Sequence, residues 1–284
     1  MKGLSRVGGE QAVWHVMNRA AHRVQIFSTD AHYTQFVSLL RTFTDRERLE
    51  VAAYAVMPNH YHLLVKGAGN RLTRCFHEVD RLWAVSWNEF REQTGHVFQG
   101  PFLSFVQHTP GWIVRTSAYI HLNPVPRMAR RPEDYSWSSY AAYAEGSPAS
   151  SWVHPEIVLR CFEESDVAAR KSYRALVEAR LEWKATAPQG PEERVVHWAL
   201  ARELAALVAR VEETLRVPHE EAKRLVAYYG RGNLLMPVKV LARALGCRNA
   251  AMLSNAIHRM RVRLQKEPGY RTLAARADEL LGRL

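Results

Sequence analysis

The most informative spacing in this chain is that of two histidines two positions apart, which is typical of metal ligands. His60 and His62 lie in the segment 57–64, Met-Pro-Asn-His-Tyr-His-Leu-Leu. On a β-strand, residues two apart point to the same face, so we expect two imidazoles side by side and Tyr61 on the opposite face. Neutral imidazoles bind divalent ions, and two are too few for a closed zinc site. The spacing favours an open metal site completed by oxygen ligands, water and a substrate phosphate. Two polar residues on a half-exposed strand are the alternative.

A tyrosine on a predicted helix is a candidate nucleophile. Tyr119 and Asn123 are four positions apart in the segment 118–124, Ala-Tyr-Ile-His-Leu-Asn-Pro, so they share one helix face. A phenol with a pKa of about 10 is a weak nucleophile at neutral pH. It becomes competent when a metal polarises the phosphate that it attacks and the phosphate is held in line. The tyrosine and the histidine pair therefore make chemical sense together, whereas a core tyrosine with a solvated hydroxyl is the alternative.

The residue patterns around these side chains predict an α+β fold. The order strand, helix, strand, strand, helix, strand indicates a ferredoxin-like split βαβ domain with an antiparallel sheet. The predicted strands span 12–18, 50–57, 60–66 and 95–106, and the last one is broken at Gly100–Pro101. One predicted helix begins at Asp30, and two others span 72–90 and 111–123. The helix that carries Tyr119 is expected to end before Pro124, because the residue before a proline disfavours helical geometry.

The C-terminal part of the chain has a different character. From about residue 195 the strand signals vanish, and helices are predicted at about 195–215, 219–229, 237–245 and 250–265. We therefore expect a first domain over 1–145, a linker and helical connection over 146–194, and an all-α, helix-turn-helix-like DNA-binding domain over 195–284. A plain helical bundle is the alternative for this last region.

The composition limits the class of protein. The chain of 284 residues carries 39 Lys and Arg against 28 Asp and Glu, a net charge of 39 − 28 = +11, which makes nucleic acid the leading partner class. Its three scattered cysteines argue against a disulfide framework and fit a reducing cytosol. No apolar run approaches the ~18 residues that a membrane span needs. We therefore expect a cytoplasmic, nucleoid-associated protein without a membrane partner.

Basic and polar residues near the predicted elements are candidate DNA contacts, since phosphate contacts supply most non-specific affinity. Three groups stand out: Asn18, Arg19 and Arg23 after the first strand; Arg127, Arg130 and Arg131 after the tyrosine helix; and Arg248, Ser254, Asn255, Arg259, Arg261 and Arg263 around the last predicted helix. Ser254 and Asn255 lie near the start of that helix, where a recognition helix would meet base edges. A solvated basic loop is the alternative for the second group.

Five ordered segments carry a resemblance to a known family. They are 15–19 (His-Val-Met-Asn-Arg), 57–64, 95–100 (Gly-His-Val-Phe-Gln-Gly), 119–125 (Tyr-Ile-His-Leu-Asn-Pro-Val) and 134–140 (Asp-Tyr-Ser-Trp-Ser-Ser-Tyr). Together they resemble the REP-associated tyrosine transposases, a branch of the single-tyrosine HUH transposases, over roughly residues 7–143. The C-terminal helices are similar to the extension that some longer members carry.

The resemblance implies an enzyme that cleaves and rejoins single-stranded DNA with hairpin structure. It implies Tyr119 as the nucleophile that forms a 5′-phosphotyrosine, and His60 and His62 as the metal-binding pair, with Asn123 as a polar residue near the metal. The implied cofactor is Mg²⁺ or Mn²⁺. Duplex DNA would be a second partner through the C-terminal helices. The active form would be a monomer, or a homodimer that exchanges the tyrosine helix.

The chain also departs from the family pattern. Ala20-Ala21 stand where the family usually has Gly and Asn, Pro101 and Leu103 stand where it usually has basic residues, and Pro126 precedes Arg127 where an Arg is usual. These changes remove phosphate contacts but leave His60, His62 and Tyr119 in place. Two other functions therefore stay open: a non-catalytic DNA-hairpin-binding or regulatory protein, and an RNA-hairpin binder.

Overall fold

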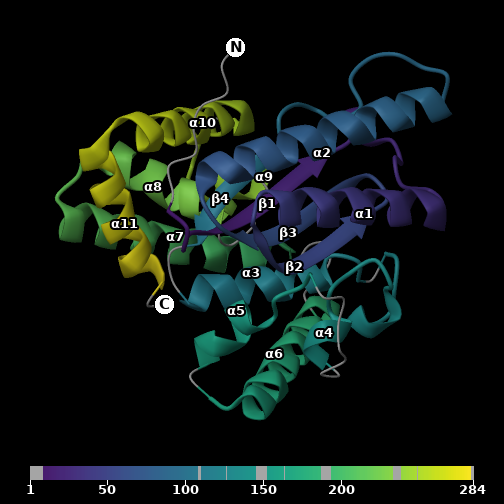
Figure 1. Cartoon of the computed structure of the whole chain (residues 1–284). Helices are drawn as coiled ribbons and strands as arrows, with labels where there is room; N and C mark the ends of the chain where they lie inside the picture. Colours follow the sequence, from purple (N-terminus) through teal and green to yellow (C-terminus); the bar gives the residue numbers. More distant parts are fainter. Residues whose placement is uncertain are drawn as a thin grey trace. The chain divides into compact units, whose positions relative to one another are not determined.

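A four-stranded antiparallel sheet forms the centre of the first part of the chain in this computed structural model (Figure 1). The structure describes residues 9–107, 110–125, 127–144, 152–162, 164–186, 193–232, 238–247 and 249–282. The strands are β1 (Val13–Arg19), β2 (Glu50–Met57), β3 (His60–Lys66) and β4 (Leu103–Gln107), in the order β2-β3-β1-β4. This order and the antiparallel pairing of all neighbours confirm the ferredoxin-like α+β fold.

The fourth strand is shorter than the sequence pattern predicts. Of the expected strand 95–106, only the part from Leu103 joins the sheet, and Phe98 makes a single bridge to Ala20. Before Leu103, the N–H of Gln99 donates to the carbonyl of Arg19 (2.9 Å) and the N–H of Ala21 to the carbonyl of Val97 (2.8 Å). Pro101 has no N–H to donate, so the ladder is interrupted between this short pairing and β4.

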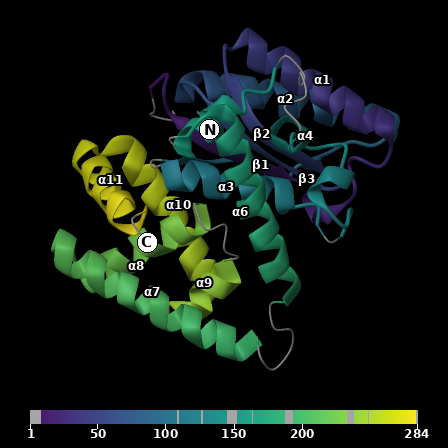
Figure 2. The same cartoon turned by 90° about the horizontal axis from the view of Figure 1, so that it is seen from below.

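Helices cover both faces of the sheet (Figures 1 and 2). One face packs against α1 (Asp30–Arg46) and α2 (Gly69–Phe90), and the other against α3 (Pro110–Leu122). The buried residues of α2 recur every three or four positions, at Leu72, Cys75, Phe76, Val79 and Trp83. The short elements η1 (Ala21–Arg23), η2 (Pro132–Asp134), α4 (Ala141–Ala144), α5 (Glu156–Leu159) and η3 (Arg160–Phe162) and the longer α6 (Asp166–Thr186) complete the helical set.

The chain divides into two compact units, and each has its own apolar core. The division falls between Leu181 and Glu182, so residues 152–181 pack with the sheet unit, whereas we expected a linker over 146–194. The second unit contains α7 (Glu193–Leu215), α8 (His219–Gly232), α9 (Val238–Ala244), α10 (Ala250–Lys266) and α11 (Pro268–Gly282). The first four match the predicted helices, and α11 is additional. None of the helices in the described part of the chain is long and apolar enough to cross a bilayer.

A buried carboxyl group connects three elements on the α2 side of the sheet. Asp80 accepts hydrogen bonds from the hydroxyl of Tyr61 (2.7 Å) and from Nδ2 of Asn18 (2.8 Å). The same Nδ2 donates to the carbonyl of Gly100 (3.1 Å). Burial raises the pKa of Asp80 to about 7, and the two hydrogen bonds oppose that shift. The network thus connects the end of β1, the start of β3 and the loop before β4 to α2.

We expect Asp80 to make the stability of the first unit depend on pH. Because its pKa is about 7 in the folded chain and near 4 in an unfolded one, the folded state binds more protons between these values. The contribution of Asp80 to the free energy of unfolding therefore falls as pH rises from about 4 to about 7, by at most about 1.4 kcal/mol per pH unit. Denaturant unfolding of the wild type and of Asp80→Asn across this range measures the difference.

The control for that experiment is Asp45→Asn, which removes an exposed carboxylate on α1. The difference between wild type and Asp80→Asn should change with pH, whereas the difference between wild type and Asp45→Asn should change less. Parallel pH curves for wild type and Asp80→Asn would contradict the assignment.

Candidate functional site

The register between β1 and β3 places three histidines on the face of the sheet that packs against α3. Arg19 lies opposite His60, Met17 opposite His62, and His15 opposite Leu64. Paired residues share a face and alternate along each strand, so His15, His60 and His62 are on one side. Tyr61 is on the other side, where it reaches Asp80. The expectation that the two histidines of 60–62 share a face opposite Tyr61 is confirmed.

The rings of His15 and His62 are stacked within the core. Nε2 of His15 lies 3.0 Å from Nδ1 of His62, and the ring centroids are 5.2 Å apart at 17°. His15 is fully buried and His62 is 1% exposed. The ring of Tyr119 is close to both, with its centroid 5.5 Å from that of His62 and 6.4 Å from that of His15. The structure therefore brings the predicted nucleophile and the predicted metal pair together within one chain.

His60 lies between two amide groups. Its Nδ1 is 2.7 Å from Oδ1 of Asn59, and its Nε2 is 3.1 Å from Oδ1 of Asn123, the residue that follows α3. The pKa of His60 is lowered to about 4, first by burial and then by the positive charges of Arg19 and Arg127, while the contact with Asn123 opposes the shift. The imidazole is consequently neutral at neutral pH and carries a single N–H.

A second buried histidine anchors the tyrosine helix. Nδ1 of His121 is 2.7 Å from the hydroxyl of Tyr173 on α6, and its Nε2 is 2.9 Å from Oγ of Ser139. Burial lowers the pKa of His121 to about 3, so this ring is also neutral. His121 points away from the site and fixes α3, and with it Tyr119, against the rest of the unit.

The residues present fit a divalent ion with open positions. In the described residues no group of three or more His, Cys, Asp or Glu could hold a metal, so His60, His62 and Asn123 would leave several positions unfilled. A neutral His60 whose Nδ1–H donates to Asn59 directs a lone pair at the Asn123 amide. Adjacent ligands of an octahedral ion bound at about 2.1 Å lie about 3 Å apart. The observed 3.1 Å between His60 Nε2 and Asn123 Oδ1 meets that requirement.

The predicted DNA contacts of the first unit are divided between surface and core. Arg127, Arg130 and Arg131 are exposed, and Arg23 lines a shallow hollow with His22, His96, Phe98 and Gln99. Arg19 is half-buried beside His60. Asn18, which we expected to contact DNA, is 6% exposed, and its amide is held by Asp80 and Gly100. Asn18 therefore holds the loop before β4 in place.

The predicted contacts of the second unit are divided in the same way. Ser254, Asn255 and Arg259 lie on the exposed face of α10. The guanidinium of Arg263 instead pairs with Glu221 (2.8 Å) and Glu267 (3.1 Å) and lies over the ring of Tyr270. Arg248 and the side chain of Arg261 lie outside the described residues.

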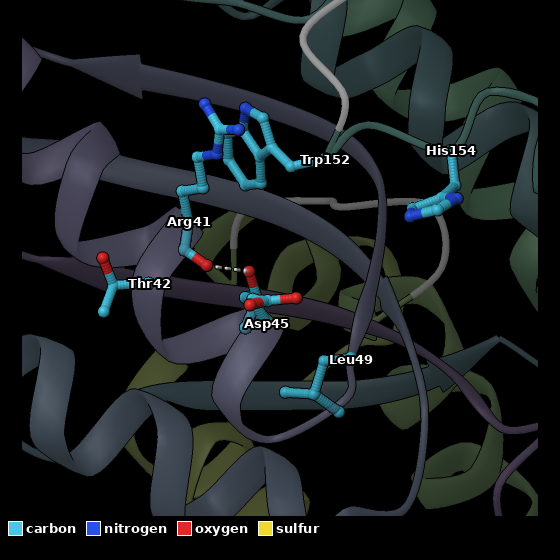
Figure 3. Close-up of a pocket in the computed structure, with 7 residues that line it drawn as sticks. Arg41, Thr42, Asp45, Leu49, Trp152 and His154 are labelled. Carbon is cyan, nitrogen blue, oxygen red and sulfur yellow. Dashed lines mark hydrogen bonds between the residues drawn. The ribbon is translucent and has the colours of Figure 1, made fainter.

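A separate pocket lies at the outer edge of the sheet unit, where α1 ends and β2 begins. Its lining includes Arg41, Asp45, Leu49, Trp152 and His154 (Figure 3). The pocket contains none of the predicted site residues. His15 belongs to the segment 15–19 but was given no role at the site from the sequence, and its local signal is a histidine between Trp14 and Val16 on β1.

Comparisons with known proteins find a family model that resembles part of the chain. Residues 10–106, about a third of the chain, match the family model described as "Transposase IS200 like". The match includes β1, β2, β3 and all but the last residue of β4, and it ends before Tyr119. No curated protein matches the chain.

Two solved structures are similar to it. A REP-associated tyrosine transposase bound to a REP hairpin is 15% identical, with a TM-score of 0.40, and the match covers 48% of this chain and 79% of that one. A transposase structure from Deinococcus radiodurans R1 is 18% identical, with a TM-score of 0.29, and covers 37% and 84%. Residues 10–106, which include His60 and His62 on the α3 face of the sheet, are thus similar to the IS200-like transposases.

Proposed function

We propose that this chain is a metal-dependent endonuclease and strand transferase for single-stranded, hairpin-bearing DNA, and that Tyr119 is its nucleophile. The observation that carries the proposal is the position of Tyr119, whose ring lies 5.5 Å from that of His62 on the helix that also brings Asn123 to His60. Transposases of this family break and rejoin DNA, which agrees with a nucleophile placed beside metal ligands. One chain supplies every residue of the site, which fits catalysis by a monomer.

The proposed reaction exchanges one phosphoester bond for another. The hydroxyl oxygen of Tyr119 attacks the phosphorus of a DNA phosphodiester, and the bond from phosphorus to the 3′-oxygen breaks. The phenol loses its proton and the departing 3′-oxygen gains one, which leaves a 5′-phosphotyrosine and a free 3′-hydroxyl. The reverse attack by a 3′-hydroxyl rejoins strands and restores the phenol. His60, His62 and Asn123 would hold Mg²⁺ or Mn²⁺, which supplies Lewis-acid polarisation of the phosphate.

Positive charge beside the site favours a phosphate there. The charges of Arg19 and Arg127 both act on His60, so both guanidinium groups are near it. Arg23, which lines the hollow, is linked to His60 through Asn59. Nδ2 of Asn59 donates to the carbonyl of Arg23 (3.1 Å), and Oδ1 of Asn59 contacts His60. A single strand that crosses the site could extend into this hollow. Since one similar structure holds a REP hairpin, hairpin DNA is the substrate to test first.

We expect a covalent protein–DNA adduct that depends on Tyr119. The wild type, incubated with Mn²⁺ and single-stranded oligonucleotides that carry varied hairpins, should give a slower band on a denaturing gel. Tyr119→Phe should give none, because the phenylalanine ring keeps the packing and loses the nucleophilic oxygen. Tyr33→Phe, which removes a hydroxyl from α1 on the opposite face of the sheet, is the matched control and should retain the band.

Two outcomes would contradict this prediction in different ways. A band that persists in Tyr119→Phe would place the nucleophile at another residue. No band with any hairpin, together with tight hairpin binding, would favour the non-catalytic DNA-binding protein instead. Competition by an RNA hairpin of the same sequence tests the RNA-binding alternative.

If Asn123 is a metal ligand, two substitutions at this position should have opposite effects on Mn²⁺ binding. If the amide oxygen of Asn123 binds the metal, Asn123→Asp keeps an oxygen ligand and should retain Mn²⁺ binding. Asn123→Leu removes the oxygen and should weaken it at least about tenfold, as His60→Ala should. Electron paramagnetic resonance of free Mn²⁺ during titration measures the affinity directly. Equal affinities for wild type, Asn123→Leu and His60→Ala would remove these residues from the proposed site.

We further propose that the exposed face of α10 binds duplex DNA. Leu253, Ile257 and Met260 are buried, which leaves Ser254, Asn255, His258 and Arg259 on the outer face. Helices α8, α9 and α10 contact one another, and Oδ1 of Asn249 caps α10 by accepting from the N–H of Met252 (2.8 Å). This is the arrangement in which a recognition helix presents its N-terminal half to a groove.

Arg259 and Arg263 should therefore differ in their effects on duplex binding. Arg259→Ala should weaken binding and make the dependence of log K on log salt less steep by about 0.9, the value for one lost phosphate contact. Arg263→Ala should mainly lower the stability of the second unit, because this residue pairs with Glu221 and Glu267. Fluorescence anisotropy at several salt concentrations separates the two. An unchanged salt slope for Arg259→Ala would contradict the proposed surface.

A further inference from the structure

The two proposed metal ligands share one feature: each has a hydrogen-bond partner at Nδ1. Asn59 Oδ1 lies 2.7 Å from Nδ1 of His60, and His15 Nε2 lies 3.0 Å from Nδ1 of His62. Both amide oxygens that contact His60 can only accept hydrogen bonds, and the shorter contact, with Asn59, favours the proton of the neutral His60 on Nδ1 and the lone pair on Nε2. Nε2 is the nitrogen that faces Asn123.

The contact between His15 and His62 allows two arrangements of protons. Either His62 donates from Nδ1 and its Nε2 carries the lone pair, or His15 donates from Nε2 and the proton of His62 is on Nε2. Only the first arrangement lets His62 bind a cation through Nε2, in the same way as His60. In metal sites, the partner at the second nitrogen commonly selects the tautomer and the ring orientation.

We infer that His15 is a positioning residue which accepts a hydrogen bond from Nδ1 of His62 and so holds the His62 lone pair on Nε2, available to a divalent cation. The inference rests on the proposed function and goes beyond it, because His15 itself would touch neither metal nor DNA. Stacking supports the role: the two rings are nearly parallel at 17°, and the pair is almost completely buried. A buried ring packed in this way cannot rotate to offer its other nitrogen without disturbing the core.

The packing around His15 explains why a histidine suits this position. Its ring also lies 6.5 Å from Phe105 on β4 and 6.4 Å from Tyr119 on α3. From the neighbouring strand, His15 thus contacts both the proposed metal ligand His62 and the proposed nucleophile Tyr119. A planar ring fills that space, and its Nε2 supplies an acceptor at the point where His62 needs one.

Three variants separate positioning from packing. His15→Leu keeps an apolar core residue and removes the acceptor. His15→Gln restores an acceptor, since its Oε1 reaches about as far from the backbone as the histidine Nε2, and it keeps the inference testable if the leucine variant fails to fold. His32→Leu changes a buried histidine on α1, which packs on the opposite face of the sheet, and is the matched control.

The first measurement uses the metal-free protein. Long-range ¹H–¹⁵N correlation spectra of protein with ¹⁵N-labelled histidine report the tautomer of His62, which His62→Gln identifies by the loss of its signals. We expect the Nδ1–H form in wild type and in His15→Gln, and a mixture or the Nε2–H form in His15→Leu. An Nε2–H form in the wild type, or an unchanged Nδ1–H form in His15→Leu, would overturn the inference.

The second measurement is Mn²⁺ affinity of the full chain. His15→Leu should bind roughly 10-fold to 100-fold more weakly than wild type, the usual effect of losing a partner behind a ligand, whereas His15→Gln and His32→Leu should stay near the wild type. Wild-type affinity in His15→Leu would overturn the inference and leave the proposed function intact. Failure of the wild type itself to bind Mn²⁺ would contradict the proposed function and reduce His15 to a packing residue.

Discussion

The pairing register of β1 with β3 is the constraint on which the candidate site depends. Arg19, Met17 and His15 reach the α3 face only because they lie opposite His60, His62 and Leu64. A slip of one residue would send the whole set to the other face. The turn between β2 and β3 fixes this register, since the N–H of Ala20 donates to the carbonyl of Asn59 (2.8 Å). The side chain of Asn59 also holds His60, so one turn residue sets both the strand pairing and the ring.

Buried polar pairs on both sides of the sheet make that arrangement specific. On the α2 side, Asp80 accepts hydrogen bonds from Asn18 and Tyr61. On the α3 side, His15 contacts His62. On α3 itself, His121 contacts Tyr173 and Ser139. A buried polar group that loses its partner costs about 1–3 kcal/mol, so each pair penalises alternative packings of its elements. The elements that carry His62, Tyr119 and the loop before β4 are therefore held in place before any ligand binds.

Local patterns in the sequence were sufficient for the parts of the site that depend on one element. Strand alternation predicts the shared face of His60 and His62, and the four-residue spacing predicts that Tyr119 and Asn123 act from one side of α3. The parts that depend on pairing between distant segments were not predictable in this way. His15 requires the β1–β3 register, and the ion pair of Arg263 with Glu221 spans 42 positions. Helix α11 was missed although Tyr270, Ala274 and Ala277, which are buried, recur at helical spacing, because two of the three are alanines and give a weak apolar signal.

The charges around the site decide how a cation and a DNA strand would influence each other. Two imidazoles and an amide contribute no negative charge, and the groups that shift the pKa of His60 include two arginines and no carboxylate. A divalent cation held there would keep its full charge next to Arg19, so the protein alone would bind it less tightly than the protein with a phosphate bound. A phosphate supplies the missing negative charge, so cation and DNA should each strengthen the binding of the other. Leu103 lies opposite Met17 on the same face, where the family usually has a basic residue, which leaves Arg19 and Arg127 to attract that phosphate.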